Sequence, residues 1–341
     1  MADVTVRGAG VFGLSVAWEC ARRGAAVRVI DTRGVGAGSS GGVVGALAPH
    51  VPENWNPKKA FQLESLLAAE AFWAGVQAAG GVDPGYARTG RVQPVVPGGE
   101  ALARAREAGA EELWQGRAEW RVVTGAPEFA PVSETNLWVH DTLTARLHPA
   151  RACAALAAAV QAAGGEVLTG DAEHHGPVVW ATGADGLADL SAALGRSVGV
   201  PVKGQAALLH FSAPRAAQLF ADGLHIVPHA DGTVAIGSTS ERAFEGLETD
   251  AQLDALIDKA ATLVPVLHGA PVVKRWAGLR PRARSRAPML GPWPGRAGHY
   301  IANGGFKIGF GMAPRVAEVM ADLVLEGHDT IPEGFRVDDS L

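Results

Sequence analysis

Cysteine is scarce in this 341-residue sequence, which contains only Cys20 and Cys153. Each lies in an apolar, alanine-rich helical pattern, and neither belongs to a pattern with metal-ligand spacing. We therefore expect two small buried side chains, no disulfide framework and no bound metal. Reduced thiols suit a reducing compartment, so this cysteine usage points to the cytoplasm.

The sequence also lacks a long apolar run and an excess of basic residues. No hydrophobic stretch reaches the length of a membrane-spanning helix. A strand-like segment begins at the third residue, which leaves no room for a signal peptide. The net charge of −5 and the pI of about 6.1 argue against a nucleic-acid partner held by overall charge. We expect a soluble cytoplasmic protein, and the sequence leaves open whether it forms a homo-oligomer.

Hydrophobic residues make up 48% of the chain, enough for a sizeable core in two domains or one composite. Periodicity predicts helices over 14–22, 57–79, 99–114, 147–163, 249–264 and 311–326. It predicts strands over 3–7, 26–30, 87–96, 137–140, 178–183, 202–211, 224–228, 233–238, 272–278 and 300–303. Because the middle strands do not alternate with helices, we expect a more antiparallel domain inserted into a nucleotide-binding fold.

Two smaller expectations concern the second half of the chain. Thr249 and Gln252 have the spacing of a capping box, so the helix over 249–264 is predicted to begin at Thr249. The segment after Gly327 carries Pro332 and several acidic residues. We expect this tail to be peripheral.

The N-terminal stretch places a glycine-rich turn between two strands. The turn is Gly8-Ala9-Gly10-Val11-Phe12-Gly13, and the second strand ends at Asp31. In such a unit Gly8 allows a tight turn, Gly10 lets a pyrophosphate approach the backbone, and Gly13 lets helix and strand pack closely. The N-terminus of the helix binds phosphate, and an acid at Asp31 accepts hydrogen bonds from an adenosine ribose. The stretch predicts a dinucleotide site and leaves FAD and NAD open.

A second glycine-rich segment follows, from Gly34 to Pro49. Such a loop lets the backbone approach a flat or phosphorylated group, and the alternative is a flexible surface loop. The hydrophobic residues within the segment and the long helix after it favour the first interpretation.

Several motifs in this order resemble FAD-dependent amino-acid and amine oxidases of the glycine oxidase and D-amino acid oxidase type. They are the Gly8–Gly13 turn with Asp31, Gly38-Ser39-Ser40-Gly41 with Gly45-Ala46, Leu147-His148-Pro149, Trp180-Ala181-Thr182-Gly183, residues 201–205, His225 to Pro228, Trp276 to Pro281, and Gly304 to Pro314. The resemblance spans nearly the whole chain and favours FAD as the cofactor.

The resemblance implies an α/β fold, more fully an α+β composite. A Rossmann-like FAD-binding domain would cover 1–82, 142–200 and 275–341. An inserted, mostly antiparallel substrate domain carrying helices would cover 83–141 and 201–274. The implied cofactor-binding residues are Gly8, Gly10, Val11, Phe12, Gly13, Asp31, Thr32, Ser39, Ser40, Gly45, Ala46, Leu47, Val167, Ala181, Thr182, Gly183, Arg280, Gly305, Phe306, Lys307, Gly309, Gly311 and Met312.

The resemblance also implies roles near the substrate. Arg280 occupies the place of an arginine that grips the substrate carboxylate, for which the planar guanidinium is suited. Lys307 falls where relatives carry arginine or lysine near the same carboxylate. For both residues the alternative is a solvated surface charge. His225 falls where glycine oxidases have a tyrosine that lines the pocket, and a structural histidine is the equal alternative there.

The implied reaction is oxidation of a small amine or amino acid, either glycine-like or a D-amino acid. A hydride passes from the substrate α-carbon to flavin N5, without an obligatory side-chain base. The imine hydrolyses to an oxo acid, and O2 is reduced to H2O2. The alternative is an amine dehydrogenase that uses another electron acceptor. The N-terminus of the helix after Gly309 would favour the anionic reduced flavin.

The sequence departs from the family pattern in three places. The strand-rich segment that usually precedes the Thr182-Gly183 strand is reduced to residues 166–175. Ser285 falls where an aspartate is common after the Arg-Pro pair. Because no cysteine lies near residues 304–314, we expect non-covalent FAD.

Arg282, Arg284 and Arg286 have three interpretations: a solvated face, a site for a second acidic group of a dicarboxylate, or a contact with a phosphate backbone. The last matches an alternative function, because the oxidase half of the bifunctional tRNA wobble-uridine modification enzyme is built similarly and shares Gly45-Ala46-Leu47 followed by a proline. A flavin-binding protein without turnover and an NAD-linked dehydrogenase are the remaining alternatives.

Overall fold

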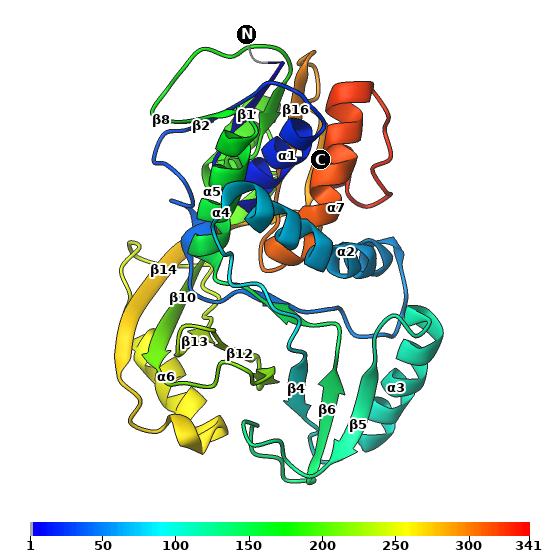
Figure 1. Ribbon diagram of the computed structural model, residues 1–341, viewed down its shortest axis with the longest axis vertical. Helices are drawn as coiled ribbons and strands as arrows, with labels where there is room; N and C mark the ends of the chain where they lie inside the picture. The colour runs from blue at the N-terminus through cyan, green and yellow to red at the C-terminus, as the bar shows by residue number, and fades with distance from the viewer. Residues whose placement is uncertain (1–2) are drawn as a thin grey trace.

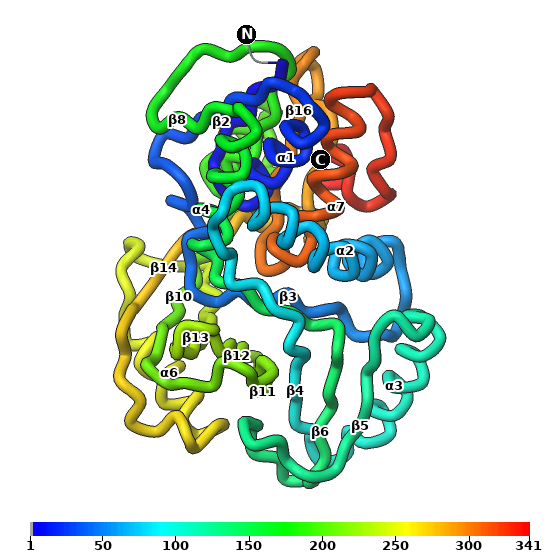
Figure 2. The backbone as a smooth tube through the Cα atoms, viewed as in Figure 1, coloured from blue at the N-terminus to red at the C-terminus, as the bar shows by residue number. Residues whose placement is uncertain are grey.

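The computed structural model describes residues 3–341, which build two regions around two large sheets (Figure 1). The first sheet has the order β15-β16-β9-β1-β2-β8 and the second has the order β14-β10-β13-β12-β11-β4-β6-β5. A small ladder of β3 (Ala46–Leu47) and β7 (Ala145–Arg146) lies between them (Figure 2). This mixed α/β architecture confirms the predicted fold class.

The six-stranded sheet is parallel except at its β15 edge. Its strands are β1 (Val4–Arg7), β2 (Val27–Asp31), β8 (Glu166–Thr169), β9 (Val178–Trp180), β15 (Met289–Pro292) and β16 (His299–Asn303). β1 lies between β2 and β9, and only the β15–β16 pair is antiparallel. The carboxyl ends of β1 and β9 therefore meet at one edge, where ligands of open α/β sheets bind.

Four helices pack together beside this sheet (Figure 1). They are α1 (Val11–Arg22), α2 (Pro57–Gly80), α4 (Pro149–Ala162) and α7 (Gly309–Ala321). α1 begins four residues after β1 ends, and this tight return depends on Gly13. A Cβ on Gly13 would overlap the Gly8 carbonyl oxygen, so the absent side chain sets how closely helix and strand approach.

The eight-stranded sheet is antiparallel except where β11 meets β4. Its strands are β4 (Arg91–Pro94), β5 (Trp120–Thr124), β6 (Leu137–Asp141), β10 (Gly199–His210), β11 (Gln218–Ala221), β12 (Leu224–Pro228), β13 (Thr233–Gly237) and β14 (Val272–Ala283). The helices α3 (Glu100–Trp114) and α6 (Ala251–Leu263) flank it (Figure 1). The long pair β10 and β14 crosses the domain boundaries expected near 200 and 275, linking this sheet to the upper region.

Several elements differ from the sequence-based expectation. The strands β5, β8, β11 and β15 and the helix α5 (Gly183–Leu194) were not predicted. The capping box at Thr249 is wrong: Asp250 is the N-cap of α6, and its side chain accepts from the backbone N–H of Gln252. Asp250 is preferred because its carboxylate reaches that N–H while its extended backbone ends the preceding loop.

The C-terminal tail is packed rather than peripheral. The α7 helix ends at Ala321 in a π-helical turn, and the chain then returns to the sheet. Phe335 is fully buried against Phe61, with ring centroids 4.8 Å apart, and its carbonyl accepts from Leu290 of β15. The sequence does not reveal this packing, because the buried residues Ile331, Phe335 and Val337 are interspersed with polar and turn residues.

The short connection between β8 and β9 covers one face of the parallel sheet with polar contacts. Thr5 of β1 exchanges two hydrogen bonds with the backbone of His175, at 2.8 and 2.9 Å. On the same strand Arg7 pairs with Asp171 at 2.6 Å, and its guanidinium lies 5.8 Å from the ring centroid of Trp180. Residues 166–175 thus contain β8 and the start of a loop that is hydrogen-bonded to the sheet.

Both cysteines are buried, as predicted, and burial raises the pKa of each thiol to about 12. Within residues 3–341 no cluster of His, Cys, Asp or Glu has the grouping of a metal site. No helix of this part of the chain is both long and apolar enough to cross a membrane.

Replacing Gly13 by alanine should destabilise the fold by about 1–3 kcal/mol, because the added Cβ meets backbone that can move only with the helix. Gly75 is the matched control, since it is also helical and nothing lies within 4 Å of a Cβ built there. Gly75→Ala should stabilise the protein by about 0.5–1 kcal/mol. Chemical denaturation of the three proteins measures both effects, and equal stability of Gly13→Ala and the parent would refute the packing argument.

Candidate active site

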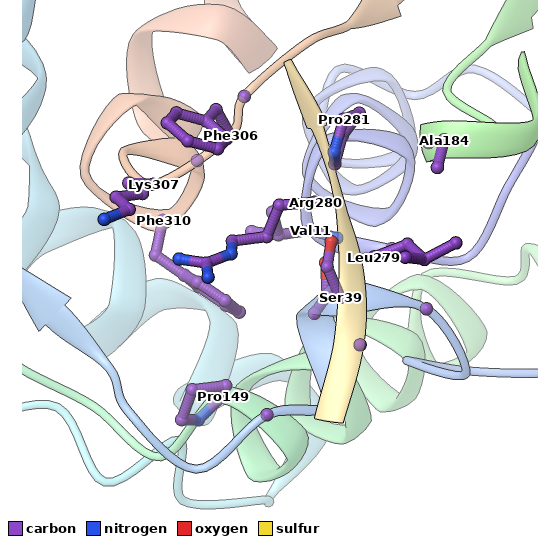
Figure 3. Close-up of a pocket in the computed structure, with 18 of the residues that line it drawn as sticks. Val11, Ser39, Pro149, Ala184, Leu279, Arg280, Pro281, Phe306, Lys307 and Phe310 are labelled. Atoms are coloured by element: carbon purple, nitrogen blue, oxygen red, sulfur yellow. The ribbon is translucent and has the colours of Figure 1, made fainter. Parts of the chain in front are cut away.

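A cavity of about 560 Å³ runs between the two regions. At one end it is lined by Gly10, Asp31 and Ser40, and at the other by Arg280 and Lys307. The first group comes from the carboxyl edge of the parallel sheet and the second from β14 and the start of α7. The cavity therefore joins a backbone-rich end to a cationic end, and Figure 3 shows the cationic end.

The backbone-rich end is built around the N-terminus of α1. Gly10 is the N-cap and has no side chain with which to cap the helix, and no acid lies in the first turn. The Ser40 hydroxyl accepts from Val11 N–H at 3.0 Å and would lie 3.2 Å from a Cβ on Gly10. The other N–H groups of the first turn, with the Ser40 hydroxyl beside them, suit a phosphate.

The Asp31 carboxylate holds this end together. It accepts three backbone N–H groups, from Ala9 at 2.8 Å, Arg33 at 2.8 Å and Gly34 at 3.0 Å. Asp31 also lines the cavity, so its remaining acceptor capacity faces the space next to α1. An extended dinucleotide with its diphosphate at α1 and an adenosine at Asp31 fits this set of donors and acceptors.

At the other end, Arg280 lies in a notch left by a glycine. A Cβ on Gly204 of the neighbouring strand would overlap the guanidinium. The guanidinium donates to the Ser238 hydroxyl at 3.0 Å and to the Thr239 carbonyl. Both acceptors are neutral, and burial lowers the pKa of Arg280 to about 10, which leaves it protonated at neutral pH. The charge is therefore available to an anionic ligand.

Lys307 and two phenylalanines complete the cationic end (Figure 3). The Lys307 ammonium and the Arg280 guanidinium lie 5.8 and 5.7 Å from the ring centroid of Phe306. Burial, and then the nearby Arg280 charge, lower the pKa of Lys307. Phe310, in the first turn of α7, lines the same wall, so the helix N-terminus opens onto this end of the cavity.

His225 stands on β12 at the wall opposite. Burial, followed by the charges of Arg91 and Lys307, lowers the pKa of His225 to about 3. Its Nδ1 is buried without a hydrogen-bond partner, and its ring contacts Phe220 with centroids 4.7 Å apart. His225 is therefore a neutral imidazole at physiological pH and has no charge to offer the ligand.

A smaller cavity of about 170 Å³ adjoins this end. It shares Ala46, Phe220, His225 and Lys307 with the larger cavity. Its other walls are formed by Ala48, Pro49, His50, Gln62, Arg91, Ile308 and Gly311.

Most residues implied by the resemblance line the larger cavity, where they could contact a ligand. Those that line it are Gly10, Val11, Phe12, Asp31, Ser39, Ser40, Ala46, Ala181, Thr182, Gly183, His225, Arg280, Gly305, Phe306, Lys307 and Gly309. Those that do not are Gly8, Gly13, Thr32, Gly45, Leu47, Val167, Gly311 and Met312.

The residues outside the larger cavity have structural surroundings of their own. Gly8 and Gly13 pack against each other, and a Cβ on Gly45 would overlap the Leu147 carbonyl oxygen. Leu47 and Met312 are completely buried in the core. Their direct contact with a cofactor stays a prediction.

The arginines after Arg280 turn away from the site. Arg282, Arg284 and Arg286 line neither cavity, and the last two are exposed. Arg282 stacks its guanidinium 5.7 Å from the centroid of Phe306, outside the cavity walls. This placement favours solvated charges over a second acidic-group site at these three residues.

Sequence reasoning missed several lining residues, including Phe220, Ser238, Asn303 and Phe310. Phe220 lies on the unpredicted strand β11, so no pattern marked it. Asn303 joins β16 to α5 by donating to the Gly183 carbonyl at 2.9 Å. Phe310 stands within the Gly304–Pro314 segment, and its neighbours Lys307 and Gly309 could have pointed to it.

Comparison with known proteins shows the family and the fold. A glycine oxidase of Pseudomonas putida (strain KT2440) is 30% identical over 372 residues, which cover 97% of this chain and 98% of the relative. A glycine oxidase of Geobacillus kaustophilus is 26% identical, with 94% and 92% covered. The crystal structure of glycine oxidase from Geobacillus kaustophilus superposes with a TM-score of 0.83 at 24% identity, covering 98% of both chains, and so shares the fold. Residues 3–323 match the DAO family model, described as FAD dependent oxidoreductase, and the chain therefore belongs to this family of FAD-dependent oxidoreductases.

Proposed function

We propose that this FAD-dependent amino-acid and amine oxidoreductase oxidises a small primary or secondary amino acid, either glycine-like or of D configuration. The observation that carries the proposal is Arg280, a buried guanidinium that faces the cavity with neutral hydrogen-bond partners only. A carboxylate is the ligand that such a planar, charged fork binds best. The relatives named glycine oxidase support the substrate class.

The chain supplies position rather than acid–base chemistry at this end. Arg280 would bind the substrate carboxylate and so orient the α-carbon toward the middle of the cavity. Phe220 and Phe310 line the cavity there with apolar surface. His225 is neutral, and the cations nearby are poor proton acceptors while charged. No side chain needs to act as an obligatory base.

The cofactor would lie along the larger cavity, with its diphosphate at α1 and its ring system near α7. When bound, FAD supplies the electron-accepting chemistry, taking a hydride from the α-carbon and passing the electrons to O2 or another acceptor. The first-turn N–H groups of α7 have no acceptors within the helix and can stabilise negative charge at the ring. Cys20 and Cys153 are buried in α1 and α4, so we propose non-covalent binding.

Anaerobic flavin reduction tests the function. Purified holoenzyme should bleach its visible flavin absorbance with at least one of glycine, sarcosine and small D-amino acids, and should recover it when air is admitted. A peroxidase-coupled assay then measures H2O2 and separates an oxidase from a dehydrogenase. Absence of bleaching with every amine and amino acid would overturn the proposal.

Removal or displacement of Arg280 should weaken substrate binding. Arg280→Ala should raise the substrate Kd at least tenfold, because a hydrogen bond to a charged group contributes about 1.5–3 kcal/mol. Gly204→Ala should produce a similar loss while Arg280 is still present, since the new Cβ occupies the place of the guanidinium. Titrations monitored by flavin absorbance measure both, and unchanged affinity in either variant contradicts the assignment.

The pH profile of kcat/KM should not depend on the titration of His225. Burial lowers its pKa from 6.5 to about 3, so it gains a proton only as the pH falls toward that value. Profiles of kcat/KM between pH 5 and 8 should therefore have the same shape in the parent and in His225→Gln. A limb near pH 6.5 that disappears in the variant would show that His225 titrates in the active enzyme.

A further inference from the structure

The cationic end of the larger cavity holds more positive charge than one carboxylate needs. Within residues 3–341 neither Arg280 nor Lys307 forms an ion pair with a carboxylate. Arg280 is buried, and a buried charge is costly unless it is paired. The buried Arg280 and the solvent-accessible Lys307 lie 5.7 and 5.8 Å from the same ring centroid, and together they favour a ligand with more than one negative charge.

The two cations face different spaces. Arg280 lines only the larger cavity, whereas Lys307 lines both the larger and the smaller one. In Figure 3 the Lys307 ammonium points away from the Arg280 guanidinium. A carboxylate at Arg280 would thus leave the smaller cavity open beside Lys307.

The walls of the smaller cavity carry donors and no acid. Its charged residues are Lys307 and Arg91, and no Asp or Glu of the described chain lines it. Arg91 is paired with the buried Asp141 at 2.9 Å, so Lys307 supplies the free charge. His225, with its unpartnered Nδ1, and His50, whose Nδ1 interacts with Gln62, add neutral polar groups. These walls suit an anion.

We propose that the smaller cavity is a subsite for a second acidic group, so that the substrate is an amino acid or amine with two carboxylates. Arg280 binds the carboxylate next to the reacting carbon, and Lys307 binds the other. This inference rests on the proposed function for its reaction, but its binding part can be tested separately. A cavity of about 170 Å³ accommodates a short acidic side arm, which glycine does not have.

Equilibrium binding to the holoenzyme tests the subsite without turnover. Succinate and its monoamide succinamate differ in one charge at nearly equal size, and neither is an amine. Flavin absorbance titrations should show succinate binding at least tenfold more tightly than succinamate. In Lys307→Met this ratio should fall to near one. Equal binding of the two ligands by the parent would overturn the subsite.

Arg282→Met is the matched control, because Arg282 lies at the same distance from the Phe306 centroid as Arg280 but lines neither cavity. It should keep the parent's preference for succinate; if it loses that preference as fully as Lys307→Met, the effect is one of overall charge and the subsite is refuted. Ala48 lines the smaller cavity and not the larger one, so Ala48→Leu should fill the smaller cavity. This variant should bind succinate more weakly than the parent does, and its affinity for acetate should be unchanged.

Steady-state kinetics distinguish the proposed subsite from the proposed oxidation of amino acids. D-aspartate compared with D-asparagine, and iminodiacetate compared with sarcosine, should show higher kcat/KM for the acid in each pair. Oxidation of the neutral compounds at equal or higher efficiency would overturn the subsite while supporting the function. Binding of succinate that depends on Lys307, without oxidation of any amine, would support the subsite and overturn the function.

Discussion

The buried charge of Arg280 is the constraint on which the lower sheet depends. A guanidinium removed from water needs acceptors, and here they are the Ser238 hydroxyl and the Thr239 carbonyl rather than a carboxylate. These acceptors follow β13, so β10, β13 and β14 must stay in register to keep them next to Gly204. The antiparallel sheet is the frame that holds one cation at the cavity without neutralising it.

A polar network behind that frame explains how the register is kept. The Thr239 hydroxyl accepts from the Gln205 N–H at 2.8 Å, and the Gln205 amide donates to Glu241 and Asp250. Lys203, almost fully buried, lies 3.5 Å from Glu241 and 3.4 Å from Asp250. Because a buried network is favourable only when its members are satisfied, this cluster penalises a slip of β10 against β13. Glu241 and Asp250 are paired with Lys203, and neither forms an ion pair with Arg280.

Much of the upper region could be predicted from the sequence because its signals are local. The helix expected over 57–79 spans Pro57–Gly80, with Asn56 as its cap and Gly81 after it, each within a turn of the residues it serves. The glycine turn is likewise a matter of adjacent residues. In contrast, α5 buries only Leu187 and Leu190 in its interior positions, too few to produce a helical period.

The substrate end was harder to predict because it is assembled from distant segments. Phe220 reaches the cavity through β11, which pairs in parallel with β4, more than a hundred residues earlier in the chain. The emptiness of the Gly204 notch depends on which strand lies beside β14, and no local pattern contains that information. Arg280 and Lys307 were identified by resemblance to a family. That these two residues border two separate cavities could be seen only in the folded chain.

The two ends of the larger cavity therefore use the chain in opposite ways. At the α1 end the cavity wall is made of backbone N–H groups next to the side chains of Asp31 and Ser40, and atoms added to the glycines of the turn would obstruct it. At the β14 end the cavity wall carries the charges of Arg280 and Lys307, and the charge of the buried Arg280 is screened less than one in open water. If Arg280 and Lys307 bind the substrate as proposed, substitutions there can change which substrate is bound while the α1 end and the fold stay as they are. A family that keeps one cofactor and varies its substrate is the expected result of this division.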